Sequence, residues 1–273
     1  MIALNEIMNQ AREDEHLGED GLLHCIRCGT PRQKQLEVLG TQYLVRCLCS
    51  CQAEAAQKAE ATRRAIELRD RVARYRSLGI TDDSLKHATF ENDRYGFPEM
   101  QVAKRYVDQW EQMRKSATGL LLWGPVGTGK TFLAACIANA LLDRAVPVMM
   151  TSFGRILGGM PGVNTGEQNR YIDSFNSFDL LVIDDLGTER ETEFAMEQVY
   201  NIIDARYRAH LPMIVTTNLK LPDLKNPKPD ARKRIYSRVL ERCVPLCINR
   251  RALRQENTDK VVTETAAILK SEN

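Results

Sequence analysis

The segment Gly124-Pro125-Val126-Gly127-Thr128-Gly129-Lys130-Thr131 matches the phosphate-loop pattern G-x-x-x-x-G-K-T. It follows an apolar run at 120–123 and opens a second one at 132–142, which predicts a strand, a glycine-rich turn and a helix. Glycines let successive backbone N–H groups turn toward one anion, and the helix that follows adds its positive end. A flexible turn between two core elements is the alternative. All four fixed positions and both flanks are present, so the sequence predicts a nucleotide site.

Two side chains of this segment have specific roles in such a loop. Lys130 is expected to reach the β- and γ-phosphates, and the Thr131 hydroxyl is expected to hold Mg²⁺. The cofactors predicted here are therefore ATP and Mg²⁺, bound by residues 124–131.

Apolar runs continue along the rest of the chain, at 146–150, 180–183, 213–215 and 244–248. Helical patterns lie between them, notably at 194–208. Continuous apolar strands alternating with helices predict an α/β fold with a parallel sheet covered on both faces. Pro245 cannot donate to a neighbouring strand, so the last run is expected at an edge. Ligands of such sheets bind at the carboxyl ends of the strands.

Polar residues follow two of these predicted strands. Asp184 and Asp185 end the run at 180–183, as in a Walker B strand, and Asn218 follows the next strand. We expect Asp184 to bind Mg²⁺ and Asp185 to orient or deprotonate the attacking water. Asn218 is expected to hydrogen-bond the γ-phosphate or that water. The alternatives are a helix cap for the two aspartates and an ordinary turn residue for Asn218.

Arginines precede the last predicted strand. An arginine delivered to the γ-phosphate of a neighbouring subunit stabilises the charge that develops in phosphoryl transfer. Arg238 is the first candidate for this role and Arg234 the second. The alternative is a solvated basic helix face.

Five of the eight cysteines lie between residues 25 and 51. Cys25 and Cys28 form a C-x-x-C-G knuckle, and Cys47, Cys49 and Cys51 close the segment after two β-prone runs around Gly40-Thr41. This pattern is typical of a zinc ribbon in which four of the five thiolates bind structural Zn²⁺, with His24 a weaker candidate. Free thiols or a redox pair are the alternatives. The other three cysteines, Cys136, Cys243 and Cys247, lie in apolar runs and are expected to be buried.

A charged helix is predicted at 52–78 and is broken from residue 79 on. It is interpreted either as a solvated linker with i,i+4 ion pairs or as a docking helix for a partner. We place the domain boundary here, with a zinc-ribbon and helical domain at 1–78 and a nucleotide-binding domain at 79–273. Residues 1–20 are expected to be a short polar helix or a loose end. A further helix is expected at 99–113.

Composition narrows the choice of partners and compartment. The net charge is +2, so any nucleic-acid site must be a local patch. No run approaches the roughly 20 apolar residues of a membrane span, and the polar N-terminus has no signal-peptide core. We therefore expect a cytoplasmic protein without a membrane partner.

An ordered set of motifs resembles replicative helicase loaders of the DnaC/DnaI type, within the AAA+ ATPases, which share an ATP-binding core with IstB-type transposition helpers. These motifs are GPVGTGKT at 124–131, LLVIDDLG at 180–187, IVTTNL at 214–219 and RIYSRVLERC at 234–243. The lead-in TFEN at 89–92 and the cysteine cluster also match, so the resemblance covers essentially residues 22–255. It implies an AAA+ fold with a five-stranded parallel sheet, self-association with nucleotide at subunit interfaces, and ATP hydrolysis acting as a switch. The partners it implies are a hexameric DnaB-type helicase, contacted through the N-terminal part, and single-stranded DNA.

The DNA-facing candidates are Phe153, Arg155, Arg170 and Tyr171, because single-strand binding combines aromatic stacking with basic side chains. Phe153 is equally well interpreted as a core residue. Asp185 stands where many AAA+ proteins have Glu, which predicts slow turnover. Residues 249–273 are too few for a full helical lid, so a lid contact from Arg251 or Arg254 is not expected. The rival functions are an IstB-type transposition helper ATPase and a non-catalytic zinc-containing adaptor.

Overall fold

The computed structural model describes residues 11–93, 96–160, 162, 165–188, 192–227, 232–250 and 265. The chain divides into two compact units, Met1–Asp70 and Arg71–Asn273, called here the N-terminal and C-terminal units. The division falls inside one long helix, α2 (Ser50–Gly79). Arg251 and Arg254, for which no lid contact is expected, lie outside the described residues. So does the first half of residues 1–20, expected to be a short polar helix or a loose end.

The N-terminal unit contains two antiparallel pairs of strands. β1 (Glu15–Leu17) pairs with β2 (Leu23–Cys25), and β3 (Gln33–Val38) pairs with β4 (Thr41–Arg46). The predicted hairpin is present, but its turn residues are Leu39 and Gly40 rather than Gly40 and Thr41. Both turn residues have positive φ (51° and 76°), as a two-residue turn needs to match the twist of the strands.

α2 is exposed on all sides over most of its length, as the charged pattern at 52–78 predicts. An ion pair joins Arg64 to Glu60, and another joins Arg63 to Glu67 at 3.6 Å, both one helical turn apart. The helix ends at Gly79, which is buried; a Cβ there would lie 2.6 Å from the carbonyl oxygen of Val148. Ile80 then forms an isolated parallel bridge with Met150.

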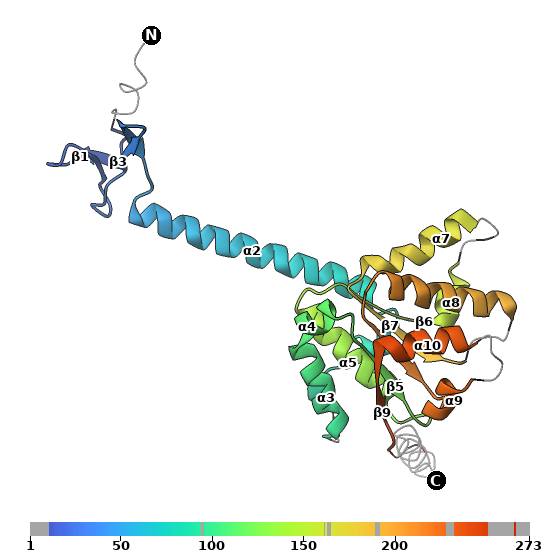
Figure 1. The fold of residues 1–273 in the computed structure, drawn as a ribbon. Coiled ribbons are helices and arrows are strands. Elements are labelled where there is room, and N and C mark those ends of the chain that lie inside the picture. The colour runs from blue at the N-terminus through green and yellow to red at the C-terminus, as the bar shows by residue number, and fades with distance from the viewer. Residues whose placement is uncertain are drawn as a thin grey trace. The chain divides into compact units, whose positions relative to one another are not determined.

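The C-terminal unit is built on a five-stranded parallel sheet with the order β6-β7-β8-β5-β9 (Figure 1). Its strands are β5 (Gly119–Trp123), β6 (Val148–Ser152), β7 (Leu180–Leu186), β8 (Met213–Thr217) and β9 (Cys243–Cys247). The strand that carries Pro245 lies at an edge, as predicted. β5 lies between β8 and β9, so the phosphate loop that follows it emerges from the interior of the sheet.

Helices cover both faces of this sheet (Figure 1). Alternate residues of a strand point to opposite faces, so Leu120 and Leu122 belong to one buried cluster and Leu121 to the other. The first face carries α3 (Pro98–Asp108), α4 (Trp110–Lys115) and α5 (Lys130–Asp143). The second carries α6 (Phe153–Gly158), α7 (Thr165–Ser174), α8 (Glu193–Arg208), α9 (Leu221–Lys225) and α10 (Lys233–Arg242).

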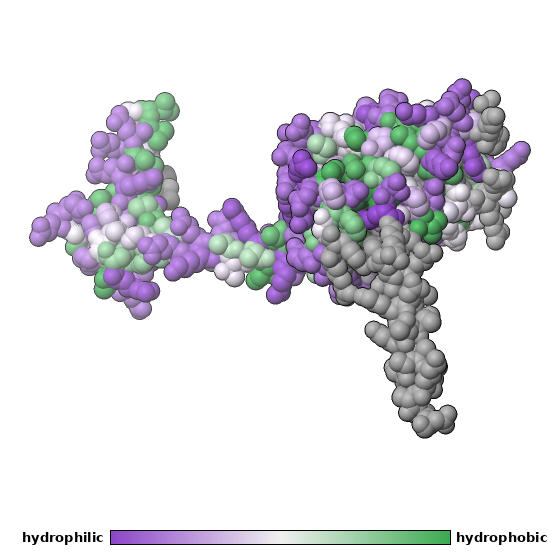
Figure 2. Space-filling model, turned by 90° about the horizontal axis from the view of Figure 1, so that it is seen from below, coloured by the Kyte–Doolittle hydropathy of each residue, from purple (hydrophilic) through white to green (hydrophobic). Residues whose placement is uncertain are grey.

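Single 3₁₀ turns complete the described elements, at η1 (Asp83–Leu85), η2 (Phe90–Asn92) and η3 (Phe175–Ser177). The helix predicted at 99–113 is two helices, α3 and α4, which meet at Gln109. Among the described residues, no helix is long and apolar enough to cross a membrane. Hydrophilic residues cover most of the visible surface in Figure 2.

Candidate functional site: a phosphate loop and a thiolate cluster

The phosphate loop joins β5 to α5 through three glycines with positive φ. These are Gly124 (147°), Gly127 (80°) and Gly129 (88°), and a side chain would strain the backbone at each. Gly124 also has no room for a Cβ, which would lie 2.3 Å from the carbonyl oxygen of Ile248. The N-terminus of α5 follows directly, so its unpaired N–H groups and positive end face the loop.

Lys130 lies inside this loop with only 5% of its surface exposed. Its Nζ donates to the carbonyl oxygens of Gly124 (2.9 Å) and Pro125 (2.7 Å). It also donates to the Asn218 side-chain oxygen at 2.7 Å, so the loop and the end of β8 meet at one charged group. The sequence separates Lys130 from Asn218 by 88 positions, and the parallel order of β5 and β8 brings them together.

A second meeting point lies at Asp184, near the end of β7. Its carboxylate accepts hydrogen bonds from Thr131 Oγ1 at 3.0 Å and from Thr216 Oγ1 at 2.6 Å. Burial raises the pKa of Asp184, and neighbouring Asp185 raises it further, while the two hydroxyls and Lys130 lower it. A half-buried carboxylate beside a threonine hydroxyl is a donor set of the kind that Mg²⁺ prefers. Thr131 and Asp184 therefore match the requirements of a Mg²⁺ site.

Asp185 has an unusual backbone conformation for a non-glycine residue, with φ of 58°. The register between β7 and β8 shifts between Ile183 and Leu186, so Asp185 lies in a β-bulge. Its N–H donates to Thr216 Oγ1 at 2.9 Å. Thr216 thus holds both aspartates, one through its proton and one through its oxygen. The motif IVTTNL at 214–219 includes Thr216, but the sequence assigned no role to this threonine, because its two contacts depend on the pairing of β7 with β8.

The two candidate arginines of α10 differ in their surroundings. Arg238 pairs with Asp204 at 2.7 Å, and its guanidinium lies 4.6 Å from the ring centre of Tyr200 and 5.5 Å from that of Tyr207. Arg234 is exposed, and none of the described ion pairs involves it. Arg238 is thus held within its own chain, whereas Arg234 points outward from the helix.

The four DNA-facing candidates do not form one patch of equal exposure. Phe153 is 1% exposed within the core between α6 and the sheet, so the interpretation as a core residue applies to it. Arg155 Nη1 donates to the carbonyl oxygen of Thr81 at 3.1 Å, and Arg155 lines a cavity of about 90 Å³ with Asp184. Arg170 is exposed on α7, and Tyr171 packs edge-on against Phe175 at 5.2 Å.

Arg250 is a further residue of the site that sequence analysis missed. Its Nε donates to the carbonyl oxygen of Thr128 in the phosphate loop at 2.6 Å. Its guanidinium lies 3.8 Å from the ring centre of Phe97, the residue before α3. A single arginine just after a strand gives no sequence signal, because the contact depends on how β9 passes the loop.

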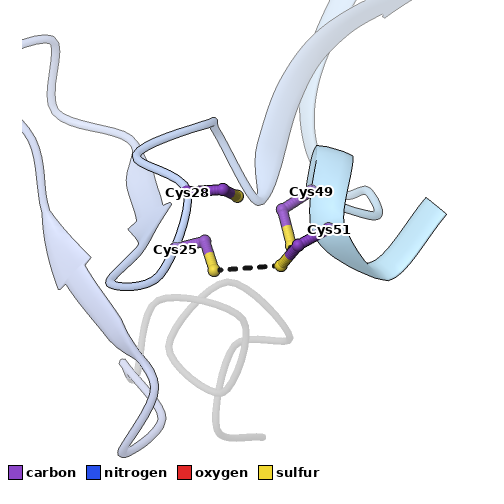
Figure 3. Close-up of side chains that lie close together, drawn as sticks. All are labelled: Cys25, Cys28, Cys49 and Cys51. Carbon is purple, nitrogen blue, oxygen red and sulfur yellow. Dashed lines mark hydrogen bonds between the residues drawn. The ribbon is translucent and has the colours of Figure 1, made fainter. Parts of the chain in front are cut away.

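The N-terminal unit contains the second site. Cys25, Cys28, Cys49 and Cys51 place their sulfur atoms within 4.8 Å of one another (Figure 3). The Cys25 and Cys51 sulfurs are 3.8 Å apart and those of Cys49 and Cys51 are 3.3 Å apart. Four thiolates about 2.3 Å from one Zn²⁺ in tetrahedral geometry would be roughly 3.8 Å apart, so the cluster matches a mononuclear zinc site.

Cys47 is the fifth cysteine of this segment and lies outside the cluster. Its thiol donates to the carbonyl oxygen of Pro31 at 3.6 Å. Cys47 follows the end of β4, where its own N–H pairs with the carbonyl oxygen of Arg32. Cys51 instead lies in the first turn of α2, which turns its sulfur toward Cys25 (Figure 3). The candidate ligands are thus a C-x-x-C and a C-x-C pair.

The surroundings of the cluster favour the thiolate form of Cys25 and Cys28. Hydrogen bonds from Ser50 and Thr30 lower the pKa of Cys28 to about 4. Arg32 donates to the Cys25 sulfur at 3.6 Å and is the main cause of the lowered pKa of Cys25. The hydrogen bond with Cys49 and burial raise the pKa of Cys51 to about 12. His24 is not a ligand in this arrangement; its ring nitrogens bond to Gly29 and Asp20, both at 2.9 Å.

The loop, the β7 aspartates and the sheet order together define a P-loop nucleotide-binding protein of the AAA+ class. The family model for IstB-like ATP binding proteins matches residues 59–261, and the chain belongs to this family. The resemblance to loaders of the DnaC/DnaI type is also confirmed, because related proteins carry that name.

Two relatives illustrate the range of the match. The replicative helicase loader DnaC of Escherichia coli K12 is 28% identical over 125 residues, 45% of this chain and 50% of DnaC. The phage-like element PBSX protein XkdC of Bacillus subtilis is 28% identical over 227 residues, 78% of each chain. The chain spans about half the length of the DnaC relatives that it matches.

Solved structures confirm the predicted fold class. The crystal structure of DnaI superimposes with a TM-score of 0.53 at 23% identity, over 66% of this chain and 98% of DnaI. A primosome component from Streptococcus pyogenes gives the same TM-score at 21% identity, over 65% of this chain and 94% of that protein.

Proposed function

We propose that the protein is an ATPase that loads a hexameric DnaB-type replicative helicase onto single-stranded DNA during the initiation of DNA replication. One observation supports the ATPase part most strongly. Lys130 and Thr131, adjacent in the chain, bond to the ends of two different strands, at Asn218 and Asp184. This joins a phosphate-binding loop to acidic and amide groups at one edge of the sheet, where phosphoryl transfer requires them.

In this proposal residues 124–131 bind the phosphates of ATP, and Thr131 and Asp184 hold Mg²⁺. The metal, when bound, neutralises charge on the phosphate oxygens. Asp185 orients or deprotonates the attacking water from its position in the bulge at the end of β7. The Asn218 side-chain oxygen accepts a hydrogen bond from Lys130, and Asn218 lies at the same carboxyl ends of the strands. Hydrolysis acts as a slow switch, stimulated by DNA or by the partner protein.

An arginine from a neighbouring subunit completes the site in this proposal. Arg238 and Arg234 are both candidates for this arginine, and they differ in the contacts that each makes within its own chain. Arg234 is exposed and belongs to no ion pair among the described residues, whereas Arg238 would first have to leave Asp204 to reach a neighbour. Self-association through this face would bring α10 of one copy to the phosphate loop of the next.

The loader role rests on the DnaC relatives and on the attached cysteine-bearing unit. We propose that residues 1–78 form a zinc-ribbon and helical domain that docks on the helicase, while 79–273 form the ATPase domain. Zn²⁺ bound by Cys25, Cys28, Cys49 and Cys51 would be structural, because four thiolates leave no open position for water. A cytoplasmic location follows from this role.

Single-stranded DNA is proposed to bind through Arg155, Arg170 and Tyr171. Phe153 supports that surface from the core rather than stacking on a base, since it is 1% exposed. Arg155 is the most informative of the three, because it also lines the cavity that contains Asp184.

The test of the proposed function is a pull-down with ATP or ADP, using the full chain and a variant that lacks residues 1–78. We expect a replicative helicase to co-purify with the full chain only, and the full chain to hydrolyse ATP. Hydrolysis that is absent with and without single-stranded DNA and helicase would contradict the ATPase and favour a non-catalytic adaptor.

The second candidate is a transposition helper ATPase, which the IstB-like family match favours. It predicts binding to a transposase and to duplex DNA, with no helicase bound. The same pull-down separates the two functions. Metal analysis tests the zinc separately: less than about half an equivalent in freshly purified protein would contradict a site that one ion must fill.

A further inference from the structure

The segment that leaves β9 crosses the phosphate loop closely. The Ile248 N–H donates to the carbonyl oxygen of Trp123 at 2.8 Å, and the Ile248 carbonyl oxygen lies against Gly124. Two residues later Arg250 Nε donates to the carbonyl oxygen of Thr128 at 2.6 Å. The segment that follows β9 thus contacts both the start and the middle of the phosphate loop.

The contact at Thr128 fixes one particular peptide plane. In a trans peptide the C=O and the following N–H point in opposite directions. With the Thr128 carbonyl turned toward Arg250, the N–H of Gly129 is turned to the other side of the plane. Gly129 has φ of 88°, and Lys130 follows it with Nζ inside the loop. The Thr128 side chain is 1% exposed and donates to the Pro125 carbonyl oxygen at 3.0 Å, so it restricts the same turn from within.

Arg250 is itself held by a second contact, with Phe97. Its guanidinium stacks on Phe97 with 3.8 Å to the ring centre, which restrains a side chain that otherwise has several rotamers. Burial lowers the pKa of Arg250, and Glu99 and Asp93 act in the opposite direction. Among the described residues Nη1 is buried without a hydrogen-bond partner, so stacking and the single bond to Thr128 orient the group.

We propose that Arg250 is a positioning residue of the nucleotide site. By holding the Thr128 carbonyl it orients the Thr128–Gly129 peptide for binding the phosphates of a nucleoside di- or triphosphate. The inference rests on the proposed nucleotide-binding function. It adds to that function a link, through Phe97, between the phosphate loop, the β9 exit and the start of α3.

The test measures the affinity of the full-length protein for a fluorescent ADP analogue with Mg²⁺. The variants are Arg250→Ala, Arg250→Lys and the control Arg105→Ala. Arg105 is an exposed arginine of α3 whose Nε bonds to its own helix at the Gln101 carbonyl oxygen. Thermal midpoints without nucleotide are recorded for each variant, and binding is measured well below the lowest midpoint.

We expect Arg250→Ala to weaken ADP binding about tenfold, the effect of losing one charge-assisted hydrogen bond, with a thermal midpoint close to that of the parent. Arg250→Lys should regain part of the affinity. Methylguanidinium should partly rescue Arg250→Ala and leave Arg105→Ala unchanged.

Two outcomes would overturn the inference while leaving the proposed function intact. One is an affinity of Arg250→Ala for the ADP analogue that lies within twofold of the parent's affinity. The other is a loss of binding in Arg250→Ala and Arg250→Lys that follows their thermal midpoints and shows no rescue. If the parent protein itself binds no nucleotide, the proposed function fails, and Arg250 has no site to position.

Discussion

The two units of the chain are stabilised by different means. In the C-terminal unit two clusters of buried apolar side chains cover the two faces of the sheet. In the described part of the N-terminal unit the buried residues are few and mixed. Leu23, Cys25 and Cys49 lie beside the polar residues Glu15, Arg32 and Gln33. Burial of apolar side chains can stabilise the C-terminal unit, whereas the N-terminal unit needs another source of free energy.

A polar network supplies part of it. Glu15 is 6% exposed and accepts from Arg46 Nη1 at 2.7 Å, and Arg32 Nη1 lies 3.5 Å from the same carboxylate. Buried ion pairs gain little net stability, because desolvation offsets the attraction. Arg32 also contacts the Cys25 sulfur, which places a positive charge beside four potential thiolates. The contrast between the units leads us to expect that a metal ion bound by the four cysteines stabilises the N-terminal unit.

The largest expected effect is metal removal. Chelation should unfold residues 15–46 while the C-terminal unit keeps its structure, because structural Zn²⁺ contributes on the order of 10 kcal/mol to such units. Hydrogen exchange of both units, followed with zinc content, measures this. Cys25→Ser should have the same effect and Cys47→Ser should not. If residues 15–46 stay protected from hydrogen exchange after the metal is removed, the N-terminal unit does not need a metal ion and the proposed difference between the units is wrong.

A core substitution in the C-terminal unit should have the next largest effect. Leu121 is fully buried in the interior strand β5, so Leu121→Ala leaves a cavity and should lower the free energy of unfolding by about 3 to 5 kcal/mol. Urea unfolding measures it, with zinc content unchanged. The control is Val244→Ala on edge strand β9, where the side chain is 54% exposed and the cost should stay near 0.5 kcal/mol.

A third prediction separates chemistry from stability within the C-terminal unit. Asp184→Asn should lower the rate of ATP hydrolysis about 100- to 1,000-fold, because it removes the charged oxygen ligand from the proposed Mg²⁺ site. Steady-state phosphate release measures it, and Asp223→Asn on the exposed face of α9 is the control. Hydrolysis that survives in Asp184→Asn would assign the metal site to other residues.

The smallest expected effect lies in α2, which belongs to both units. Arg64→Ala removes the exposed pair with Glu60 and should cost less than about 0.5 kcal/mol. Thermal unfolding of both units measures it, with Arg69→Ala as a second exposed site. A cost well above this in the presence of a partner, and only at Arg64, would favour the docking helix over the solvated linker.

Much of the C-terminal unit could be predicted from sequence, since its strands are apolar runs and its loop has a fixed pattern. Parallel strands with both faces buried need continuous apolar residues, and this signal locates all five. The bulge at Asp185 could not be predicted, because a register shift depends on the pairing of β7 with β8. Arg206 is similar. It is fully buried and donates to four backbone carbonyls, among them those of Phe178 and Pro212, yet it reads as a surface arginine of a helix.

The sequence by itself determined the phosphate loop, the strand–helix alternation and a cluster of cysteines from which four metal ligands could come, because these depend on residue type and short spacing. Only the tertiary structure decided which thiols meet, since the start of α2 turns Cys51 rather than Cys47 toward Cys25. It also decided that Arg250 reaches Thr128 across 122 positions. Contacts of this kind depend on the path of the backbone between distant elements, and no local pattern of side chains records that path.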